Sequence, residues 1–207
     1  MATPVYPLGI EMSRPSKMPE GSWSIDASRC NVGSKLHLIK DSVCEHCYAL
    51  KGNYRYPVVK TAQERRYQAI WQDHWVPMMA QLISSQTWFR WFDAGDIQGA
   101  EHLVKIVAIC KLTPDTNHWL PTKEYGVVRQ HLRLHGPFPT NLLVRVSAPM
   151  VDGEPIDLDG LPSSVVSRHR DYADIAHLCP ANHQGGKCLD CRACWLPSVK
   201  VSNYPEH

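Results

Sequence analysis

Seven of the eight cysteines in this 207-residue chain fall into two groups whose spacing is typical of metal binding. The C-terminal group reads C-P-x7-C-x2-C-x2-C and comprises Cys179, Cys188, Cys191 and Cys194. A C-x2-C-x2-C run with a distant Cys-Pro is typical of 4Fe–4S sites, because two-residue gaps let successive thiolates wrap around the corners of a cubane. A structural zinc site is the alternative, although zinc prefers two C-x2-C pairs.

The N-terminal group, C-x13-C-x2-C, offers three thiols and no obvious fourth: Cys30, Cys44 and Cys47. Three thiolates would leave one iron of a cubane open to a substrate oxygen, water, or the amine and carboxylate of a cofactor. His37 or His46 is an alternative fourth ligand, and the two cysteine groups can also share a single site. We therefore expect one or two 4Fe–4S clusters.

Four charged residues in or after strand-like segments are candidate catalytic residues: Arg90, Asp93, Asp96 and Lys123. Asp93 and Asp96 flank Ala94-Gly95 and can orient a cofactor, a substrate or a metal-bound water, although Asp and Gly also favour turns. Arg90 lies among aromatic residues and is expected to point inward, where a buried guanidinium needs an anion such as Asp93 or a ligand carboxylate. Lys123 can anchor an anionic group or begin a surface helix.

Strand-like and helical segments alternate along the chain, which predicts βαβ units and an α/β fold. We expect strands over 22–27, 87–92, 117–122, 141–147, 164–167 and 173–178, and helices over 57–84 (broken near Pro77), 100–112 and 124–134. The architecture is then a partial parallel (β/α) barrel or an open sheet with a cysteine-rich C-terminal segment. In either, functional loops lie at the carboxyl ends of strands, where Asp93, Asp96, Thr122, Lys123 and Cys179 fall. Residues 1–21 are expected to form an extended arm, and 22–207 a single domain.

Two other residues have simpler interpretations. Cys110 follows the apolar run 106–109, which predicts a small buried side chain rather than a ligand. Arg145 alternates with apolar residues in the strand-like segment 141–147, and we expect it on the exposed face of that strand.

Composition excludes several classes. The 22 basic and 20 acidic residues give no basic excess for duplex nucleic acid. No apolar run approaches the roughly 20 residues of a membrane helix, and the N-terminus has no apolar signal region, so we expect a cytoplasmic protein with reduced thiols. Neither a Gly-rich phosphate loop nor a G-x-S-x-G elbow is present.

Several stretches together resemble the phage gene product 88 family over about residues 17–207: SWSIDASRC, CEHCYALKGNYRYPVVKTAQERR, WFRWFDAGDI, HWLPTKEY, LCPANHQGGKCLDCRACW and VSNYPEH. The resemblance implies an iron–sulphur protein of viral origin, acting in an infected bacterial host. The order of a three-cysteine loop, a helix and a strand ending in a small-residue acidic motif also resembles the radical S-adenosylmethionine partial barrel. Cys30, Cys44, Cys47 and Gly95-Asp96 would take those roles, although that superfamily has C-x3-C-x2-C and its methionine-binding motif is matched only loosely.

From these observations we predict an enzyme that uses an open cluster iron as a Lewis acid to hydrolyse an ester or amide of a small molecule. One alternative is a radical S-adenosylmethionine enzyme, with Asp96 and Arg90 among its methionine-binding groups. The other is a non-enzymatic protein for electron transfer, redox sensing or interaction, with a structural cluster or zinc. For each of these hypotheses that includes a cluster, a redox partner that exchanges electrons with the cluster is a possible partner.

Overall fold

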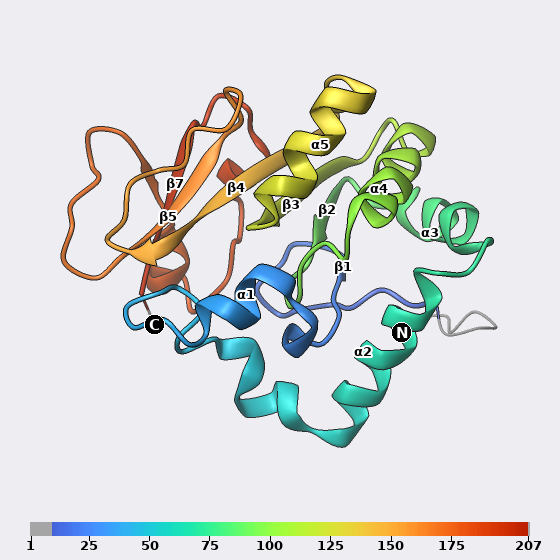
Figure 1. The fold of residues 1–207 in the computed structure, drawn as a ribbon, viewed down its shortest axis with the longest axis horizontal. Coiled ribbons are helices and arrows are strands. Elements are labelled where there is room, and N and C mark those ends of the chain that lie inside the picture. Colours follow the sequence, from blue (N-terminus) through green and yellow to red (C-terminus); the bar gives the residue numbers. More distant parts are fainter. Residues whose placement is uncertain (1–9, 207) are drawn as a thin grey trace.

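A computed structural model describes residues 10–206 and contains a seven-stranded sheet whose strands are all parallel (Figure 1). The strands are β1 (Ser22–Trp23), β2 (Trp88–Trp91), β3 (Asn117–Thr122), β4 (Leu142–Val151), β5 (Ser163–Ser167), β6 (His177–Leu178) and β7 (Val201–Pro205). Their order is β1-β2-β3-β4-β5-β7-β6, with β1 and β6 at the two edges. The predicted α/β fold with a parallel sheet is confirmed, and the sheet is open.

Five α-helices connect or flank the strands: α1 (Asn31–Leu36), α2 (Pro57–Ala69), α3 (Trp75–Ile83), α4 (Ala100–Leu112) and α5 (Tyr125–His135). Figure 1 shows α3, α4 and α5 side by side on one side of the sheet, while α1 and α2 lie towards one end of it. Among the described residues, no helix has the length and apolar character needed to cross a membrane.

The pleat of the central strands divides their side chains between two buried faces. Phe89, Leu120 and Val144 lie in the main core, with residues of α3, α4 and α5. On the opposite face, Trp119 packs against Trp195 of the C-terminal segment. One face of the sheet therefore supports the helices, and the other is available to the cysteine-rich chain that returns across it.

The predicted helix over 57–84 is interrupted, but not at Pro77. α2 ends at Ala69 and α3 begins at Trp75, so the break lies over residues 70–74. Pro77 lies in the first turn of α3, where backbone N–H groups have no partner within the helix and a missing one costs nothing.

The expected strand over 22–27 is also shorter than predicted. Only Ser22 and Trp23 pair with β2, because Asp26 accepts a hydrogen bond from the backbone N–H of Ser28 and starts a 3-10 turn over Ala27–Arg29. At the other end, the predicted strand 173–178 is reduced to β6, and β7 was not predicted.

Residues 10–21, the described part of the predicted arm, run alongside the sheet. The side chains of Ile10 and Met12 are buried in the main core, and Ser13 forms an antiparallel bridge with Ser22. The rest of that arm, residues 1–9, lies outside the described residues.

Two histidines in the core make stability depend on pH. Burial lowers the pKa of His102 and of His118 to about 3. Histidine in an unfolded chain has a pKa near 6.5, so below that pH the unfolded state binds protons that the folded state excludes. Stability is therefore fully present above about pH 6.5 and is lost as the pH falls towards 3.

We expect the free energy of unfolding to decrease by about 1.4 kcal/mol per pH unit for each of these histidines once the pH is well below 6.5. Urea unfolding followed by tryptophan fluorescence between pH 7.5 and 5 measures the slope. A His118→Gln variant should lose one histidine's share of that slope, and an unchanged slope in this variant would contradict the prediction.

Candidate functional site

Three thiols meet in the segment that follows β1. We call Cys30, Cys44 and Cys47 the N-terminal thiol group. The absent side chain of Gly33 leaves space between two of them: a Cβ there would lie 3.6 Å from Sγ of Cys30 and 3.7 Å from Sγ of Cys44. Cys47 is near enough for its charge to affect the thiol of Cys30. The fold thus gathers all three at the carboxyl end of β1, as the sequence predicts for functional loops.

Backbone contacts hold this segment against the sheet. The N–H of Val43 donates to the carbonyl of Pro149 in β4 at 2.9 Å, and the N–H of Val151 donates to the carbonyl of Asp41 at the same distance. Glu124, just before α5, accepts a hydrogen bond from the N–H of Val32 at 3.0 Å. Elements more than 90 residues away along the chain therefore fix the position of the N-terminal thiol group.

The surroundings of Cys30 and Cys44 favour the neutral form of their thiols. Burial raises the pKa of Cys30 and of Cys44, the nearby Asp96 carboxylate raises both further, and the ammonium of Lys123 opposes the rise. Metal ligation requires thiolates, and Lys123 offsets their negative charge only in part. A bound metal would supply the remaining positive charge, and its binding would release the thiol protons.

Asp96 joins the loop after β2 to the loop after β3. Its Oδ1 accepts from the hydroxyl of Thr122 at 2.6 Å and from the N–H of Ile97 at 2.8 Å, while Oδ2 accepts from the N–H of Lys123 at 2.9 Å. Burial raises the pKa of this carboxyl group. With both oxygens already engaged, Asp96 acts here as a positioning residue for Lys123 and for the loop beside Cys30.

Asp93 is similarly engaged. Its Oδ1 accepts from the hydroxyls of Ser13 and Ser22 at 2.9 and 2.7 Å, and its Oδ2 accepts from the hydroxyl of Tyr54 at 3.2 Å. The hydroxyl of Tyr48, next to Cys47, donates to the backbone carbonyl of Asp93. The loop after β2 and the cysteine segment are thus tied together directly.

Arg90 points inward, as its aromatic neighbours predict, but it does not pair with Asp93. Its guanidinium lies 4.5 Å above the ring of Trp119, and Nη1 is 3.9 Å from Sδ of Met18. Its Nε is shielded from solvent without a hydrogen-bond partner. No ion pair among residues 10–206 includes it.

The remaining four thiols form the C-terminal thiol group, Cys179, Cys188, Cys191 and Cys194. The N–H of Cys179 donates to Asn203 of β7 at 2.8 Å, and the N–H of Cys188 donates to Lys17 at 3.0 Å. The charges of Cys179 and Cys191 affect the thiol of Cys188, and that of Cys179 affects Cys194, which places the four close together. They lie on the face of the sheet opposite the helices.

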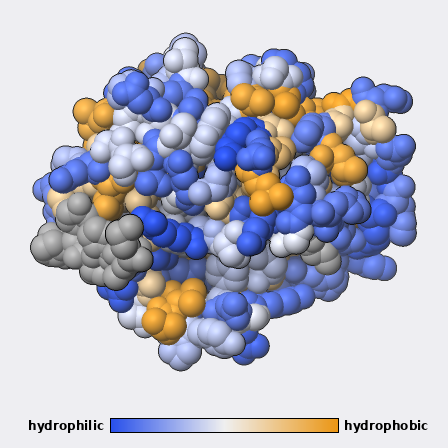
Figure 2. All heavy atoms as spheres, turned by 180° about the vertical axis from the view of Figure 1, so that it is seen from behind, coloured by the Kyte–Doolittle hydropathy of each residue, from blue (hydrophilic) through white to orange (hydrophobic). Residues whose placement is uncertain are grey.

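A single cavity of about 1030 Å³ connects the two thiol groups. It is lined by six of their cysteines and by the four candidate catalytic residues: Cys30, Cys44, Cys47, Cys179, Cys188, Cys194, Arg90, Asp93, Asp96 and Lys123. On the outer surface seen in Figure 2, the apolar side chains of the described residues lie in small groups among polar ones and form no large apolar patch. The cavity is therefore the place where a small molecule would meet these residues.

The grouped cysteines carry free thiols that are available for metal ligation. All eight cysteines are free. Within residues 10–206, no three His, Cys, Asp or Glu side chains come as close together as one metal ion requires. Zinc would draw its sulphurs to about 2.3 Å from one point, whereas the thiolates of a cubane are farther apart because four irons lie between them. The donor set, three free thiols in one group and four in the other, is of the kind that 4Fe–4S clusters use.

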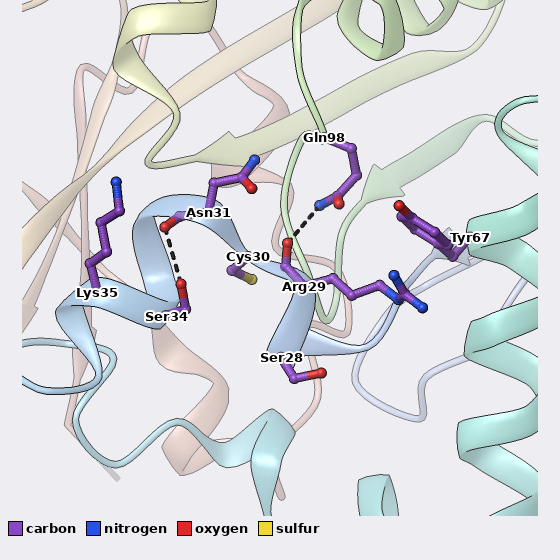
Figure 3. A pocket seen from close by; sticks show the side chains of 8 residues that line it. All are labelled: Ser28, Arg29, Cys30, Asn31, Ser34, Lys35, Tyr67 and Gln98. Carbon is purple, nitrogen blue, oxygen red and sulfur yellow. Dashed lines mark hydrogen bonds between the residues drawn. The ribbon is translucent and has the colours of Figure 1, made fainter.

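A smaller pocket of about 510 Å³ lies on the outer side of Cys30 (Figure 3). Arg29 extends over the ring of Tyr67, with its guanidinium carbon 3.7 Å from the ring centre, and Gln98 donates to the carbonyl of Arg29 at 3.1 Å. Because Cys30 lines both this pocket and the large cavity, it separates the two.

Sequence reasoning missed several residues that define the site. Tyr48, Tyr54 and Tyr204 line the cavity, and Glu124 holds the cysteine segment. The alternation of residues 201–205 signals a strand and could have revealed Tyr204, but the contact partners of the other three are distant in sequence. Arg145, expected on an exposed face, is fully buried because the C-terminal segment covers that side of the sheet. Cys110 is buried in the core, as predicted.

Comparison with known proteins decides the family. A family model described as Gene product 88 matches residues 20–197, which is most of the chain. The chain belongs to the gene product 88 family, known from phages. The matched span of this gene product 88 member begins just before β1 and includes all seven grouped cysteines, whereas β7 and Tyr204 follow it. No curated protein matches the chain, and no solved structure does.

Proposed function

We propose that this protein is an iron–sulphur enzyme with a 4Fe–4S cluster on each thiol group, and that the N-terminal cluster reacts with S-adenosylmethionine. The observation that carries the proposal is that the three N-terminal thiols and three of the four C-terminal thiols line one cavity beside a parallel sheet. Three thiolates leave one iron without a protein sulphur, and the cavity gives a ligand access to it.

The N-terminal cluster would be held by Cys30, Cys44 and Cys47. Neither histidine considered as a fourth ligand is favoured: His37 is exposed and does not line the cavity, and the His46 side chain is 67% exposed. Once reduced by an external one-electron donor, such a cluster supplies the electron that breaks a carbon–sulphur bond of S-adenosylmethionine. Lys123, beside the group, can bind the carboxylate of that molecule.

The arrangement of the loops favours this reaction over hydrolysis. Small side chains pack the loop after β2 against the cysteine segment, with Ala94 against Ala27 and Ala49. This order of a cysteine loop after the first strand and a small-residue loop after the second supports the likeness to radical S-adenosylmethionine enzymes. Hydrolysis would use a free carboxylate as general base beside the open iron, but Asp93 and Asp96 are both engaged in hydrogen bonds.

Anaerobic expression followed by iron, zinc and sulphide analysis tests the cofactor. We expect about eight irons and eight sulphides per chain, as two cubanes require. After reduction with dithionite in the presence of S-adenosylmethionine, chromatography should detect 5′-deoxyadenosine and methionine in equal amounts. Zinc without sulphide would overturn the proposal as a whole. Full clusters that produce no 5′-deoxyadenosine but hydrolyse activated esters faster than the apo protein would favour the Lewis-acid enzyme instead.

A further inference from the structure

One sulphur of the C-terminal thiol group has a tyrosine hydroxyl within hydrogen-bond distance. Either atom can donate while the sulphur is a thiol, and the hydroxyl donates once it is a thiolate. The hydroxyl of Tyr204 in β7 lies 3.1 Å from Sγ of Cys194, and both side chains are half-buried at the cavity wall. Burial raises the pKa of Cys194 to about 11, and both the Tyr204 hydroxyl and the guanidinium of Arg145 oppose that rise. Among these groups, the Tyr204 hydroxyl and the Arg145 guanidinium favour negative charge on this sulphur, against the effect of burial.

Arg145 brings an uncompensated positive charge to the same place. Its side chain is fully buried, and its guanidinium donates to the carbonyls of Ser163, Val199 and Ala193 at 2.9, 3.0 and 3.4 Å. Its Nε has no partner, and no carboxylate within residues 10–206 forms an ion pair with it. A buried charge without an anion is costly, so an anion is expected beside it.

Arg90 is a second such cation. It lines the cavity with Cys188 and Cys194, and its charge affects the thiols of both. Because it also lacks an ion-pair partner in the described part of the chain, two guanidinium groups face the C-terminal thiol group. The charges of Asp93 and Cys194 both act on Arg90, and four thiolates around a cubane would supply the negative charge that Arg145 lacks.

We propose that Tyr204, Arg145 and Arg90 raise the reduction potential of the C-terminal cluster above that of the N-terminal cluster. The inference rests on the proposed function, since it requires a cluster at each group. Reduction adds one negative charge to a cluster, and hydrogen bonds to its sulphurs or nearby cations stabilise that charge. The N-terminal thiol group has a more balanced environment, because the carboxylate of Asp96 and the ammonium of Lys123 both act on Cys30.

Potentiometric titration of the full chain, followed by electron paramagnetic resonance at fixed pH 8, tests this. In Tyr204→Phe, we expect the ratio of reduced to oxidised C-terminal cluster at the wild-type midpoint to fall about tenfold, equivalent to about 59 mV for one electron. Tyr172→Phe is the matched control: this buried tyrosine donates to the carbonyl of Gly153 at 2.6 Å and contacts no grouped cysteine, so the midpoint should not move.

If Tyr204→Phe fails to hold its C-terminal cluster, a second pair of variants still tests the inference. Arg90→Gln should lower the midpoint of the C-terminal cluster, and Arg90→Lys, which keeps the charge, should restore most of it. Full iron and sulphide with unchanged midpoints in Tyr204→Phe and Arg90→Gln would overturn this inference and leave the proposed function standing. Absence of sulphide in the wild-type protein would instead overturn the proposed function.

Discussion

Replacing Cys44 and Cys47 with alanine is expected to abolish 5′-deoxyadenosine formation, by at least about a thousandfold, while about half of the iron and sulphide stays bound. The reason is that a cubane cannot be held by the single remaining thiolate of Cys30, whereas the C-terminal thiol group keeps all four of its ligands. Iron and sulphide analysis, together with chromatographic assay of the reduced protein, measures both effects on the same sample.

Cys110→Ala is the matched control for this experiment. Cys110 is fully buried in the main core, away from both thiol groups, so its loss should cost only a small amount of stability and no iron. Loss of all iron from the double variant would mean that the two groups share one cluster. Retention of all iron and of activity would contradict the role of the N-terminal thiol group.

A second large effect is expected from Gly95→Ala. A Cβ at this position would lie 2.3 Å from Cγ1 of Ile25 and 3.0 Å from its carbonyl oxygen, and the backbone has a φ of +86°. Positive φ costs an alanine about 1–2 kcal/mol, and forcing a methyl group against buried Ile25 adds about 1–3 kcal/mol. We expect a total loss of roughly 2–5 kcal/mol in the free energy of unfolding, together with reduced iron at the neighbouring N-terminal thiol group.

Gly136→Ala separates the cost of positive φ from the cost of the contact with Ile25. Gly136 has a φ of +77°, but a Cβ there would meet nothing within 4 Å. Denaturant unfolding of both variants therefore isolates the contact with Ile25 as the difference between them. If Gly95→Ala were no more destabilising than Gly136→Ala, the close packing of the loop after β2 against Ile25 would be contradicted.

Elements with a strong local period could be predicted from the sequence. The bounds of α4 and β3 agree with the predicted 100–112 and 117–122, because their apolar residues recur at helical or strand spacing and the chain between them is short. Position 77 illustrates the limit of such rules: proline interrupts a helix interior but is tolerated in a first turn, and the sequence did not show where the second helix begins.

The parts that failed depend on contacts between distant residues. The burial of Arg145 follows from a C-terminal segment about 50 residues later that covers its side of the sheet. The hydrogen bonds of Asp93 join it to residues 39 to 80 positions away. The spacing of the cysteines could not predict that both groups face one cavity, since that depends on the strand order.

The position of β7 between β5 and β6 also constrains when the two centres can form during synthesis. β6 pairs with β7, and Cys179 is hydrogen-bonded to Asn203 of that strand. The C-terminal thiol group therefore cannot take its place until residues 201–205 have left the ribosome, whereas the N-terminal thiols and strands β1 to β4 emerge much earlier. Under the proposed function, metal delivery to the two groups would be separated in time. A nascent chain stalled before β7 would have an unfinished sheet edge and four C-terminal thiols not yet brought together.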